Sequence, residues 1–280
     1  MTDKTLGRLT ADQCEQAALA RFAADYSEHR AAEGRGHAGE ELLGLPYLKA
    51  GPLARQWSVR ARSFEAFRSH VMQAEARRLG RPLRLLDLGA GNGWLCHRAA
   101  LEGHSAVALD IRDDEIDGLG AARLFLDRTP GHIECVVAGF DEIPLESETI
   151  DIALFNAALH YTTDLVRTLR ETARVVRPAG RIVILDSPFY ARESDGTAMV
   201  AEKRANAARR FGDRAETLLA LPFIEFLTRD RLREASAGLG LDWQRKRVRY
   251  PLWYELRPLH AAIRRQRKPS RFDLWVSIRP

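Results

Sequence analysis

One short segment of the chain combines a carboxylate with closely spaced glycines, which is a combination suited to holding a nucleotide-like ligand. Asp87 lies in a hydrophobic run and is followed by Gly89, Gly91 and Gly93, in the order GxGxG. Glycine tolerates positive φ angles and, without a Cβ, lets the backbone approach a ligand closely. An apolar run that ends in such a loop is typical of a buried strand turning sharply into a helix. The segment therefore predicts a nucleotide-like cofactor at the end of a strand.

A second acid follows at a spacing that suggests binding of a ribose. The apolar run 105–109 ends in Asp110, and in nucleotide-binding α/β folds an acid about 20 positions after the glycine loop accepts hydrogen bonds from ribose hydroxyls. The loop has the form GxGxG, not the GxGxxG of dinucleotide binders, and the chain has no GxxxxGKS/T phosphate loop. A glycine turn that only packs a helix on a sheet is the alternative, but it leaves Asp110 without a role.

The stretch LLDLGAGNG at residues 85–93, taken with Asp110, resembles motif I of the class I S-adenosylmethionine-dependent methyltransferases. Later landmarks, over roughly residues 80–280, are similar to the ubiquinone- and menaquinone-biosynthesis-like branch of that family. The resemblance implies S-adenosylmethionine as the cofactor and S-adenosylhomocysteine as its product. The cofactor-binding residues that it implies are Asp87, Gly89, Ala90, Gly91, Asp110, Ile111, Phe140, Asp141, Asn156 and Ala157.

The third expected strand is followed by a segment where this family usually carries an acid and an apolar residue that enclose the adenine. Gly139 stands where the acid is commonest, so we expect adenine recognition to differ locally. Phe140 could stack on the base, and Asp141 could accept a hydrogen bond from its amino group. A plain core position explains Phe140 equally well.

Residues 150–161 resemble the fourth strand and the loop that leaves it, and in the family this loop borders both the methionine part of the cofactor and the acceptor. His160 is therefore the candidate general base, because imidazole titrates near neutrality and can take a proton from a hydroxyl or an amine. A histidine that only hydrogen-bonds the backbone is the alternative. Tyr161, next to it, is a candidate for the acceptor pocket.

The sequence Asp-Ser-Pro-Phe-Tyr at residues 186–190 superficially resembles the D/N/S-P-P-Y/F motif of methyltransferases that act on exocyclic amines of nucleic acids. That motif follows the fourth strand, whereas this one follows the fifth and has Ser187 in place of the first proline, so we interpret the likeness as accidental. Its position still predicts that Asp186, Phe189 and Tyr190 lie at the rim of the acceptor pocket, where the rings could bind an apolar substrate.

Strands and helices alternate from residue 83 onward. Such alternation predicts an α/β fold in which ligands bind at the carboxyl ends of the strands. With the family resemblance, the expected fold is a Rossmann-like seven-stranded, mostly parallel sheet with helices on both faces. The expected strands are 83–88, 105–111, 133–138, 150–156, 181–186 and 272–278, and the expected helices between them are 93–101, 115–126 and 164–176.

Two segments outside this alternation are expected to cover the site. Residues 1–80 are rich in helix formers and predict an N-terminal helical cap, before a methyltransferase domain at 81–280. Arg55 or Arg60 in the cap could hold the carboxylate of the cofactor, although surface arginines on a packing helix are the alternative. Within the domain, residues 191–226 predict an insertion whose apolar end suits a lid.

Composition and charge set outer limits on function. A chain of 280 residues with 45% apolar content can bury one large core. No apolar run approaches the roughly 18 to 20 residues of a membrane span, and no apolar signal segment begins the chain, so a cytoplasmic protein without membrane partners is expected. No clustered set of acids, histidines or cysteines predicts a metal site.

The carboxyl-terminal segment is strongly basic, with 11 Lys and Arg but two acids in residues 244–280. Such a tail could attract an anionic substrate or a nucleic acid. A strand with one solvated face explains it as well, because Arg245, Arg247 and Arg249 recur at every second position.

Together these patterns favour a methyltransferase that acts on a small-molecule acceptor, by transfer to oxygen. In-line displacement from a sulfonium needs little covalent help from the protein, which must align the reacting atoms, exclude water and remove a proton where necessary. The alternatives are an RNA methyltransferase that uses the basic tail and an S-adenosylmethionine-binding protein that transfers no methyl group. The sequence leaves the acceptor atom, the substrate and the oligomeric state open.

Overall fold

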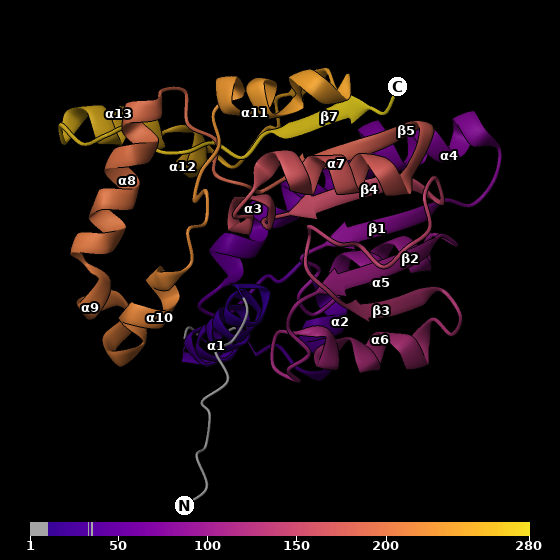
Figure 1. The fold of residues 1–280 in the computed structure, drawn as a ribbon, viewed down its shortest axis with the longest axis horizontal. Helices are drawn as coiled ribbons and strands as arrows, with labels where there is room; N and C mark the ends of the chain where they lie inside the picture. The colour runs from indigo at the N-terminus through magenta and orange to yellow at the C-terminus, as the bar shows by residue number, and fades with distance from the viewer. Residues whose placement is uncertain (1–10, 33, 35) are drawn as a thin grey trace, which may run out of the picture.

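The computed structural model describes residues 11–32, 34 and 36–280, with side chains from residue 17 onward. Residues 1–10 of the expected cap lie outside this range. A single sheet runs through the molecule with helices on both faces, and further helices stand beyond one end of its strands (Figure 1). None of the described helices is long and apolar enough to cross a membrane.

The sheet has seven strands in the order β3-β2-β1-β4-β5-β7-β6. Strands β1 to β5 pair in parallel, whereas β7 is antiparallel to both β5 and β6. The expected seven-stranded, mostly parallel sheet is therefore confirmed. The strands are β1 (Arg84–Leu88), β2 (Ser105–Asp110), β3 (Ile133–Val137), β4 (Ile150–Asn156), β5 (Val176–Leu185), β6 (Trp243–Lys246) and β7 (Leu274–Ile278).

The order of strands places a topological switch point between β1 and β4, because β2 and β3 follow on one side of β1 while β4 and β5 follow on the other. In open α/β sheets, ligands bind in the crevice outside the carboxyl ends of the strands at such a point. All seven residues of β4 are buried, as expected for a central strand that is covered on both faces. The fold therefore predicts a ligand site at the carboxyl ends of β1, β2 and β4.

Helices cover both faces of the sheet. On one face α5 (Trp94–Leu101) and α6 (Arg123–Arg128) pack with helices of the N-terminal region, and on the other lie α7 (Leu165–Val175) and α11 (Arg229–Ser236). The side chains of Asp164 and Thr228 cap α7 and α11 by accepting a backbone N–H three residues later. Short 3-10 turns complete this region: η3 (Leu159–Tyr161) and η5 (Ala237–Leu239).

The helix expected at 115–126 is shorter than predicted. Its first half is a turn followed by η2 (Leu119–Ala122), and only Arg123–Arg128 is α-helical. The carboxylate of Asp114 accepts hydrogen bonds from the N–H groups of Ile116 and Asp117, at 3.0 and 2.9 Å. Such local side-chain bonds compete with the helical pattern, so the polar start of the segment forms a turn instead.

The boundary between α7 and β5 also differs from the prediction. A helix to residue 176 and a strand from 181 were expected, but β5 already begins at Val176, which pairs with Ile150. The register then shifts before Arg181 pairs with Ile152, and Ala179 between them has a φ of 61°. Residues between the expected helix and the expected strand therefore form an irregularity inside β5.

The N-terminal region is helical, as expected. It contains α1 (Ala11–Ala32), α2 (Gly39–Gly44), α3 (Ala54–Phe67), η1 (Arg68–Met72) and α4 (Gln73–Leu79). Phe64, Phe67 and Met72 of this region are fully buried in the same core as β1 and α5. Helices α3 and α4 thus belong structurally to the sheet domain, whereas α1 makes its apolar contacts elsewhere.

The segment between β5 and α11 is mostly helical. It contains α8 (Glu193–Ala205), α9 (Ala207–Phe211), η4 (Gly212–Arg214) and α10 (Ala215–Ala220). Figure 1 shows α8, α9 and α10 standing beyond the carboxyl ends of the parallel strands, with α1 beside α10. Phe22 of α1 shares a small buried cluster with Phe211 and Leu218 of this segment. Nearby, α12 (Leu252–Glu255) and α13 (Arg257–Ile263) lead to β7.

Candidate functional site

The glycine loop wraps around the carboxyl end of β2. The N–H groups of Gly89 and Ala90 both donate to the carbonyl oxygen of Leu109, at 2.8 and 3.0 Å. Gly89 has a φ of 76°, and a Cβ built there would lie 2.4 Å from the Cβ of Ala158. Neither this backbone conformation nor this close approach suits a side chain, so the loop requires glycine at this position.

Asp110 lies directly beneath the loop and holds it in place. Its Oδ2 accepts a hydrogen bond from the N–H of Gly91 at 2.8 Å, and its Oδ1 accepts one from the N–H of Arg112 at 2.9 Å. Burial raises the pKa of Asp110, while the Arg112 guanidinium opposes that effect. Each carboxylate oxygen can accept a second hydrogen bond, so Asp110 keeps the capacity to bind ribose hydroxyls.

Asp87, at the end of β1, is an unsatisfied carboxylate in the middle of the site. The residue is 1% exposed, its Oδ1 has no hydrogen-bond partner, and the nearest donor to Oδ2 is the thiol of Cys96 at 4.0 Å. Burial, with the nearby charge of Asp110, raises the pKa of Asp87 to about 8. A buried carboxylate without a partner is costly, and a bound cationic group would relieve that cost.

Arg60 of α3 lies close enough to the strand ends for its charge to act on three of the predicted site residues. For Asp87 and Asp186, burial raises the pKa and the positive charge of Arg60 opposes that larger effect. For His160, burial lowers the pKa and the charge of Arg60 adds to that effect. Arg55 instead places its guanidinium 4.1 Å from the ring centre of Trp253. Of the two arginines considered from the sequence, Arg60 is therefore the one at the site.

Asp186 follows β5 and is held by a hydrogen-bond network that crosses to α3. The hydroxyl of Ser63 donates to Oδ1 of Asp186 and lies 2.8 Å from the hydroxyl of Tyr250. Burial raises the pKa of Asp186 to about 6, and its Oδ2 has no partner. The side chain is therefore buried among polar groups, rather than standing at an open pocket rim.

The two rings that follow Asp186 are engaged in packing. Phe189 stacks on Trp275 with ring centres 4.6 Å apart, in the core cluster on the α7 and α11 face. Tyr190 packs edge-on against Phe226, and its hydroxyl accepts a hydrogen bond from Arg267 at 3.2 Å. Both rings lie outside the linings of the two cavities described below.

His160 lies at the exit of β4 in a strongly desolvating environment. Burial, together with the positive charges of Lys203 and Arg60, lowers its pKa to about 3. Its Nδ1 is buried without a hydrogen-bond partner, and its ring centre lies 4.3 Å from that of Tyr161. Its carbonyl oxygen accepts a hydrogen bond from the N–H of Glu225, which ties it to the insertion. At neutral pH the imidazole is therefore uncharged.

Phe140 and Asp141 lie where the loop after β3 meets the glycine loop. The ring of Phe140 comes within 3.3 Å of the position that a Cβ of Gly89 would take, and it packs edge-on against Phe155. Phe140 thus covers the glycine loop and also belongs to the edge of the core. Asp141 instead faces Arg167 of α7, with 3.9 Å between the charged groups.

Asn156 and Ala157 lie at the carboxyl end of β4. Asn156 is buried, and Ala157 has a φ of 58° while its N–H donates to the carbonyl oxygen of Leu185. This turn carries the chain away from the sheet directly beside β1. The structure therefore brings the predicted residues of β1, β2 and β4 together at one edge.

An aromatic cluster from α1 covers this edge, and the sequence analysis did not identify it. The hydroxyls of Tyr26 and Tyr161 lie 2.8 Å apart, and Phe22 packs edge-on against Phe223 of the insertion at 4.8 Å. Ile111, next to Asp110, packs against the same cluster. The four-residue spacing of Phe22 and Tyr26 places both rings on one face of α1. In the sequence, this shared face is the one feature of the two residues that indicates an aromatic cluster.

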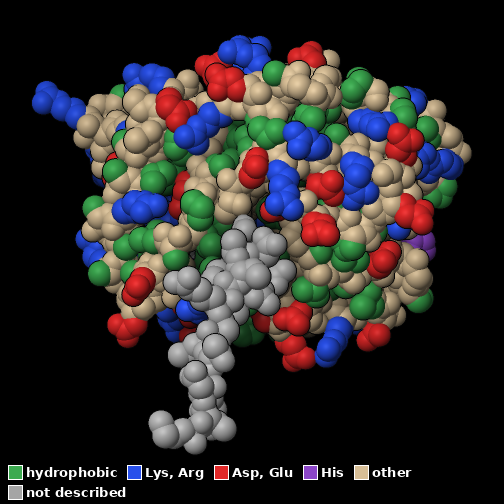
Figure 2. Space-filling view, viewed as in Figure 1, with side chains coloured by type: hydrophobic (Ala, Val, Ile, Leu, Met, Phe, Trp, Pro, Cys, Tyr) green, Lys and Arg blue, Asp and Glu red, His purple; other side chains and the backbone are tan. Residues whose placement is uncertain are grey.

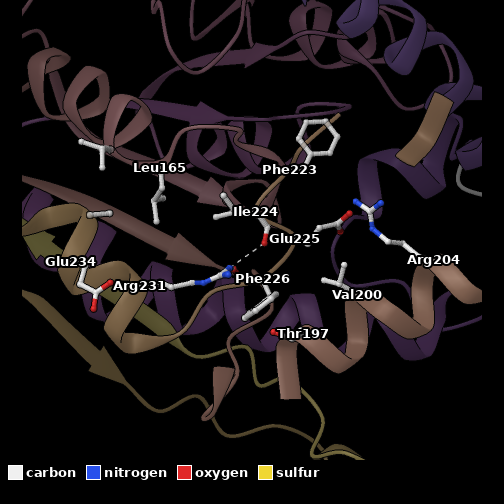
Figure 3. Close-up of a pocket in the computed structure, with 12 residues that line it drawn as sticks. Leu165, Thr197, Val200, Arg204, Phe223, Ile224, Glu225, Phe226, Arg231 and Glu234 are labelled. Carbon is white, nitrogen blue, oxygen red and sulfur yellow. Dashed lines mark hydrogen bonds between the residues drawn. The ribbon is translucent and has the colours of Figure 1, made fainter. Parts of the chain in front are cut away.

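Two cavities lie on either side of the segment 223–226. The larger, of about 650 Å³, lies between α7, α8 and α11, and Arg231 reaches across it to the carbonyl oxygen of Ile224 at 3.3 Å (Figure 3). The smaller, of about 170 Å³, lies between α1 and the insertion. Phe223 lines both cavities, so this segment is the wall between them.

Five of the eleven Lys and Arg residues of the basic tail form ion pairs within the fold. Acidic side chains lie within 4.0 Å of five of its arginines: Arg245, Arg247, Arg267, Arg271 and Arg279. Positive and negative side chains are also interspersed over the face shown in Figure 2. These five arginines of the tail therefore have acidic partners within the protein.

Comparisons with known proteins agree with this architecture. Residues 86–184 match the family model described as a methyltransferase domain. A segment of 99 residues is 38% identical to an uncharacterized methyltransferase of Mycobacterium tuberculosis, over 35% of this chain and 37% of that protein. A segment of 136 residues is 35% identical to the malonyl-(acyl-carrier protein) O-methyltransferase of Methylococcus capsulatus, over 47% and 44% of the two chains.

A third relative is the ubiquinone/menaquinone biosynthesis C-methyltransferase of Proteus mirabilis, 30% identical over 115 residues, or 40% of this chain and 45% of that protein. The matched segments thus cover less than half the length of these three relatives. Among solved structures, the 1,6-didemethyltoxoflavin-N1-methyltransferase of Burkholderia thailandensis, with bound S-adenosylhomocysteine, shares the fold with a TM-score of 0.55 and 17% identity, over 100% and 97% of the chains. Residues 86–184 thus match a methyltransferase domain, and the chain shares the fold of a solved methyltransferase that binds S-adenosylhomocysteine.

Proposed function

We propose that this class I methyltransferase transfers the methyl group of S-adenosylmethionine to an oxygen atom of a small-molecule acceptor. One observation carries the cofactor part of this proposal: two carboxylates lie at the ends of adjacent strands, and they differ in their hydrogen bonding. Asp110 is held under the glycine loop by two backbone N–H groups, whereas Asp87 is buried with an unpartnered oxygen. The first state suits binding of neutral hydroxyls, and the second suits binding of a cation.

The residues at this edge fit the chemical groups of S-adenosylmethionine. The unpartnered Oδ1 of Asp87 is suited to the ammonium of the methionine part, and Arg60 supplies a positive charge for its carboxylate. Asp110 would accept from the ribose hydroxyls, and Phe140 would flank the adenine. When bound, the cofactor supplies a methyl group on a sulfonium, which is activated for displacement.

We propose His160 as the group that accepts the proton of the acceptor hydroxyl. Its low pKa keeps the imidazole unprotonated at neutral pH, so that it is available as an acceptor of a proton. A low pKa also makes it a weak base. A weak base is sufficient for a hydroxyl oxygen that becomes strongly acidic only as its new bond to carbon forms, because the proton is lost late in the displacement.

The cap supports the small-molecule part of the proposal. In-line displacement requires the reacting atoms to be aligned and water to be excluded. Tyr26 and Phe22 of α1 meet Tyr161 and Phe223 over the strand ends, which would enclose a compact acceptor. An RNA acceptor would need a free basic surface, and five of the tail arginines that could contribute to one are paired with acids, as described above.

Isothermal titration with S-adenosylhomocysteine tests the cofactor site. The Asp110→Ala variant should bind the ligand about 100-fold more weakly, because it loses the ribose acceptor and the support of the loop. The matched control is Asp113→Ala, an exposed acid three residues along the same segment, whose affinity should stay within about twofold of the wild type. Absence of binding to the wild type, or equal binding by the Asp110→Ala variant, would remove the basis of the proposal.

The acceptor atom requires a second experiment. Incubation of a metabolite extract with S-adenosylmethionine that carries a ¹³C-labelled methyl group, followed by NMR of the labelled products, distinguishes methyl on oxygen from methyl on nitrogen, carbon or sulfur. An O-methyl product that is lost in the His160→Ala variant is the expected result. Labelled methyl found on nitrogen or carbon would contradict transfer to oxygen while leaving the cofactor site intact.

A further inference from the structure

The smaller cavity is built from the cap and the insertion, and its lining is unusual in charge. Its walls come from α1, η3, α8, α9, α10 and the segment that follows α10. Three lining residues are cationic, and no acid lines the cavity. The lining residues are Phe22, Tyr26, His29, Arg30, Tyr161, Lys203, Arg210, Phe211, Leu218 and Phe223.

Two of the three cations are fixed by acids that lie outside the cavity lining. Arg30 pairs with Asp117 at 2.7 Å, and Lys203 pairs with Glu225 at 2.7 Å. Both pairs are largely shielded from solvent, with side-chain exposures between 7% and 16%. These acids fix the positions of the two cations and offset much of their charge, so Arg30 and Lys203 contribute oriented hydrogen-bond donors to the wall, and the unpaired positive charge of the lining is that of Arg210.

Arg210 is the third cation, and it stands exposed at the edge of the cavity. Among the described residues it makes no ion pair; its contact is with the ring of Phe211, 5.3 Å away on the same helix. Its charge is therefore available for an incoming anion. An exposed arginine beside two fixed cations and an apolar floor is the arrangement that selects an anionic group attached to an apolar body.

The apolar walls indicate the shape of that body. Phe22 and Phe223 pack edge-on at 4.8 Å, and Tyr161 packs edge-on against Phe223 at 5.5 Å. Edge-on and offset contacts are those that aromatic rings prefer, so a further ring fits this wall. The volume of about 170 Å³ lies well below the range of about 300 to 1,000 Å³ that drug-sized ligands occupy. The body is therefore a single ring.

The cavity also adjoins the proposed reaction centre. Tyr161 lines it, and the ring of Tyr161 lies 4.3 Å from that of His160. The hydroxyl pair of Tyr26 and Tyr161 supplies polar atoms on the same side. A ring that carries its anionic group toward Arg210 would therefore place its other end on the side of Tyr161, next to which the ring of His160 lies.

We infer that this cavity binds the methyl acceptor and that the acceptor is a single-ring aromatic acid bearing a hydroxyl. The inference rests on the proposed function and adds the substrate class. The cations bind the acid group, the aromatic walls bind the ring, and the hydroxyl oxygen attacks the methyl carbon as the bond from that carbon to sulfur breaks. The hydroxyl proton passes to His160, so that S-adenosylhomocysteine and the O-methyl aromatic acid are the products.

Binding is measured with three probes in the presence of saturating S-adenosylhomocysteine: 4-hydroxybenzoate, phenyl phosphate and the neutral 4-hydroxybenzamide. The carboxylate and the phosphate share the ring and the negative charge, and comparing them shows which acid group the cavity prefers. At least one anion should bind about tenfold or more tightly than the amide, because a charged group finds cationic partners that the amide lacks. Equal affinities, or no binding of either anion, would overturn the inference.

The Arg210→Gln variant tests the cavity itself, and Arg209→Gln is the matched control on the same short helix. Arg209 is also exposed but does not line the cavity. Arg210→Gln should weaken binding of the preferred anion about fivefold and leave that of 4-hydroxybenzamide unchanged, whereas Arg209→Gln should change neither. Equal effects of the two variants, or an equal loss for anion and amide, would contradict the inference.

The two proposals fail in different ways. If the wild type does not bind S-adenosylhomocysteine, the proposed function fails, whatever the aromatic acids do. If it binds S-adenosylhomocysteine but does not distinguish the anions from the amide, only the inferred acceptor class fails. Titration with S-adenosylhomocysteine alone should give the same affinity for the wild type and for both arginine variants.

Discussion

The proposed cofactor side and the proposed acceptor side of this site are held together in different ways. On the cofactor side, the glycine loop and Asp110 are joined by hydrogen bonds within residues 89–112, and backbone groups donate them. On the acceptor side, the contacts join side chains that are far apart in the chain: Tyr26 with Tyr161, 135 positions away, and Glu28 with Arg214, 186 positions away. The first side is locally specified, whereas the second depends on how α1 docks.

The two sides can therefore vary independently. A loop tied by backbone hydrogen bonds to the neighbouring strand persists as long as the sheet does. Helix α1 is held by a small aromatic cluster, the shielded pair of Arg30 with Asp117 and the exposed pair of Glu28 with Arg214, which contributes little, so α1 is less firmly attached than the loop. One scaffold can therefore keep its cofactor site while its cap, and with it the acceptor, changes.

The largest effect is expected from Gly89→Ala, which tests whether the cofactor side depends on its backbone. The new Cβ would lie 2.4 Å from that of Ala158, at a φ of 76°. The variant should lose S-adenosylhomocysteine affinity by about 100-fold or more in isothermal titration, because the loop has to move. Gly103→Ala is the control, since φ is 83° there but nothing lies within 4 Å.

The control should show only the strain of a positive φ, about 1 to 2 kcal/mol in the free energy of unfolding, with unchanged ligand affinity. If Gly89→Ala behaves like Gly103→Ala, the close packing of the loop is not what forms the cofactor site.

An intermediate effect is expected from Phe22→Ala, which removes the centre of the cluster between α1 and the insertion. Turnover should fall about tenfold or more, because the cap no longer excludes water or aligns the acceptor. The affinity for S-adenosylhomocysteine should change by less than about threefold, since Phe22 contacts the cap rather than the loop. Leu101→Ala, at an exposed apolar position at the end of α5, is the control.

The comparison of the two sides is tested most sharply by measuring both S-adenosylhomocysteine affinity and turnover for Phe22→Ala and Leu101→Ala. An equal loss of cofactor affinity and turnover in Phe22→Ala would show that the two sides are coupled, and the comparison drawn above would be wrong.

The smallest effect is expected in the pH dependence of stability, to which Asp87 contributes. Its pKa in the folded protein is about 8, against about 4 for an unfolded aspartate. Between these values the folded state binds more protons than the unfolded state, so stability falls as pH rises from about 4 to about 8. Buried His160 and His97, whose pKa values are lowered to about 3 and about 4, have the opposite effect up to about pH 6.5, so the net drop in melting temperature without ligand is expected mainly between about pH 6.5 and 8.

In the Asp87→Asn variant this part of the slope should disappear, while the smaller part due to Asp186 between about pH 4 and 6 remains. Asp113→Asn, at an exposed position, should keep the wild-type profile. A profile for Asp87→Asn that follows the wild type would show that this carboxylate is not the strained group of the cofactor side.

Much of the fold followed from local patterns. The apolar runs at the cores of β1, β2 and β4 predicted buried strands, and the glycine spacing predicted the turn after β1 correctly. The helix expected at 115–126 was too long because Asp114 holds its start in a turn through its own side chain. Such competition depends on the rotamer of one carboxylate, which periodicity does not reveal.

The acceptor side was harder to predict because position along a strand does not fix where a ring points. Phe189 and Tyr190 follow β5 as expected, yet Phe189 packs on Trp275 from β7, nearly ninety residues later in the chain. Conversely, nothing in the sequence beyond their shared helix face indicated that Phe22 and Tyr26 belong to the acceptor side. Whether such rings line a pocket depends on which distant segment docks against them.

The sequence by itself determined the cofactor side: the strand, the glycine loop and Asp110 lie within about 25 residues, and their geometry follows from glycine conformations and the pairing of adjacent strands. Only the tertiary structure decided the acceptor side. There α1 and the insertion meet through contacts between residues more than one hundred positions apart, and these contacts form only after the sheet has brought both segments to the same edge. That is why the methyl donor could be read from one motif, whereas the class of acceptor had to be inferred from the cavity that the cap encloses.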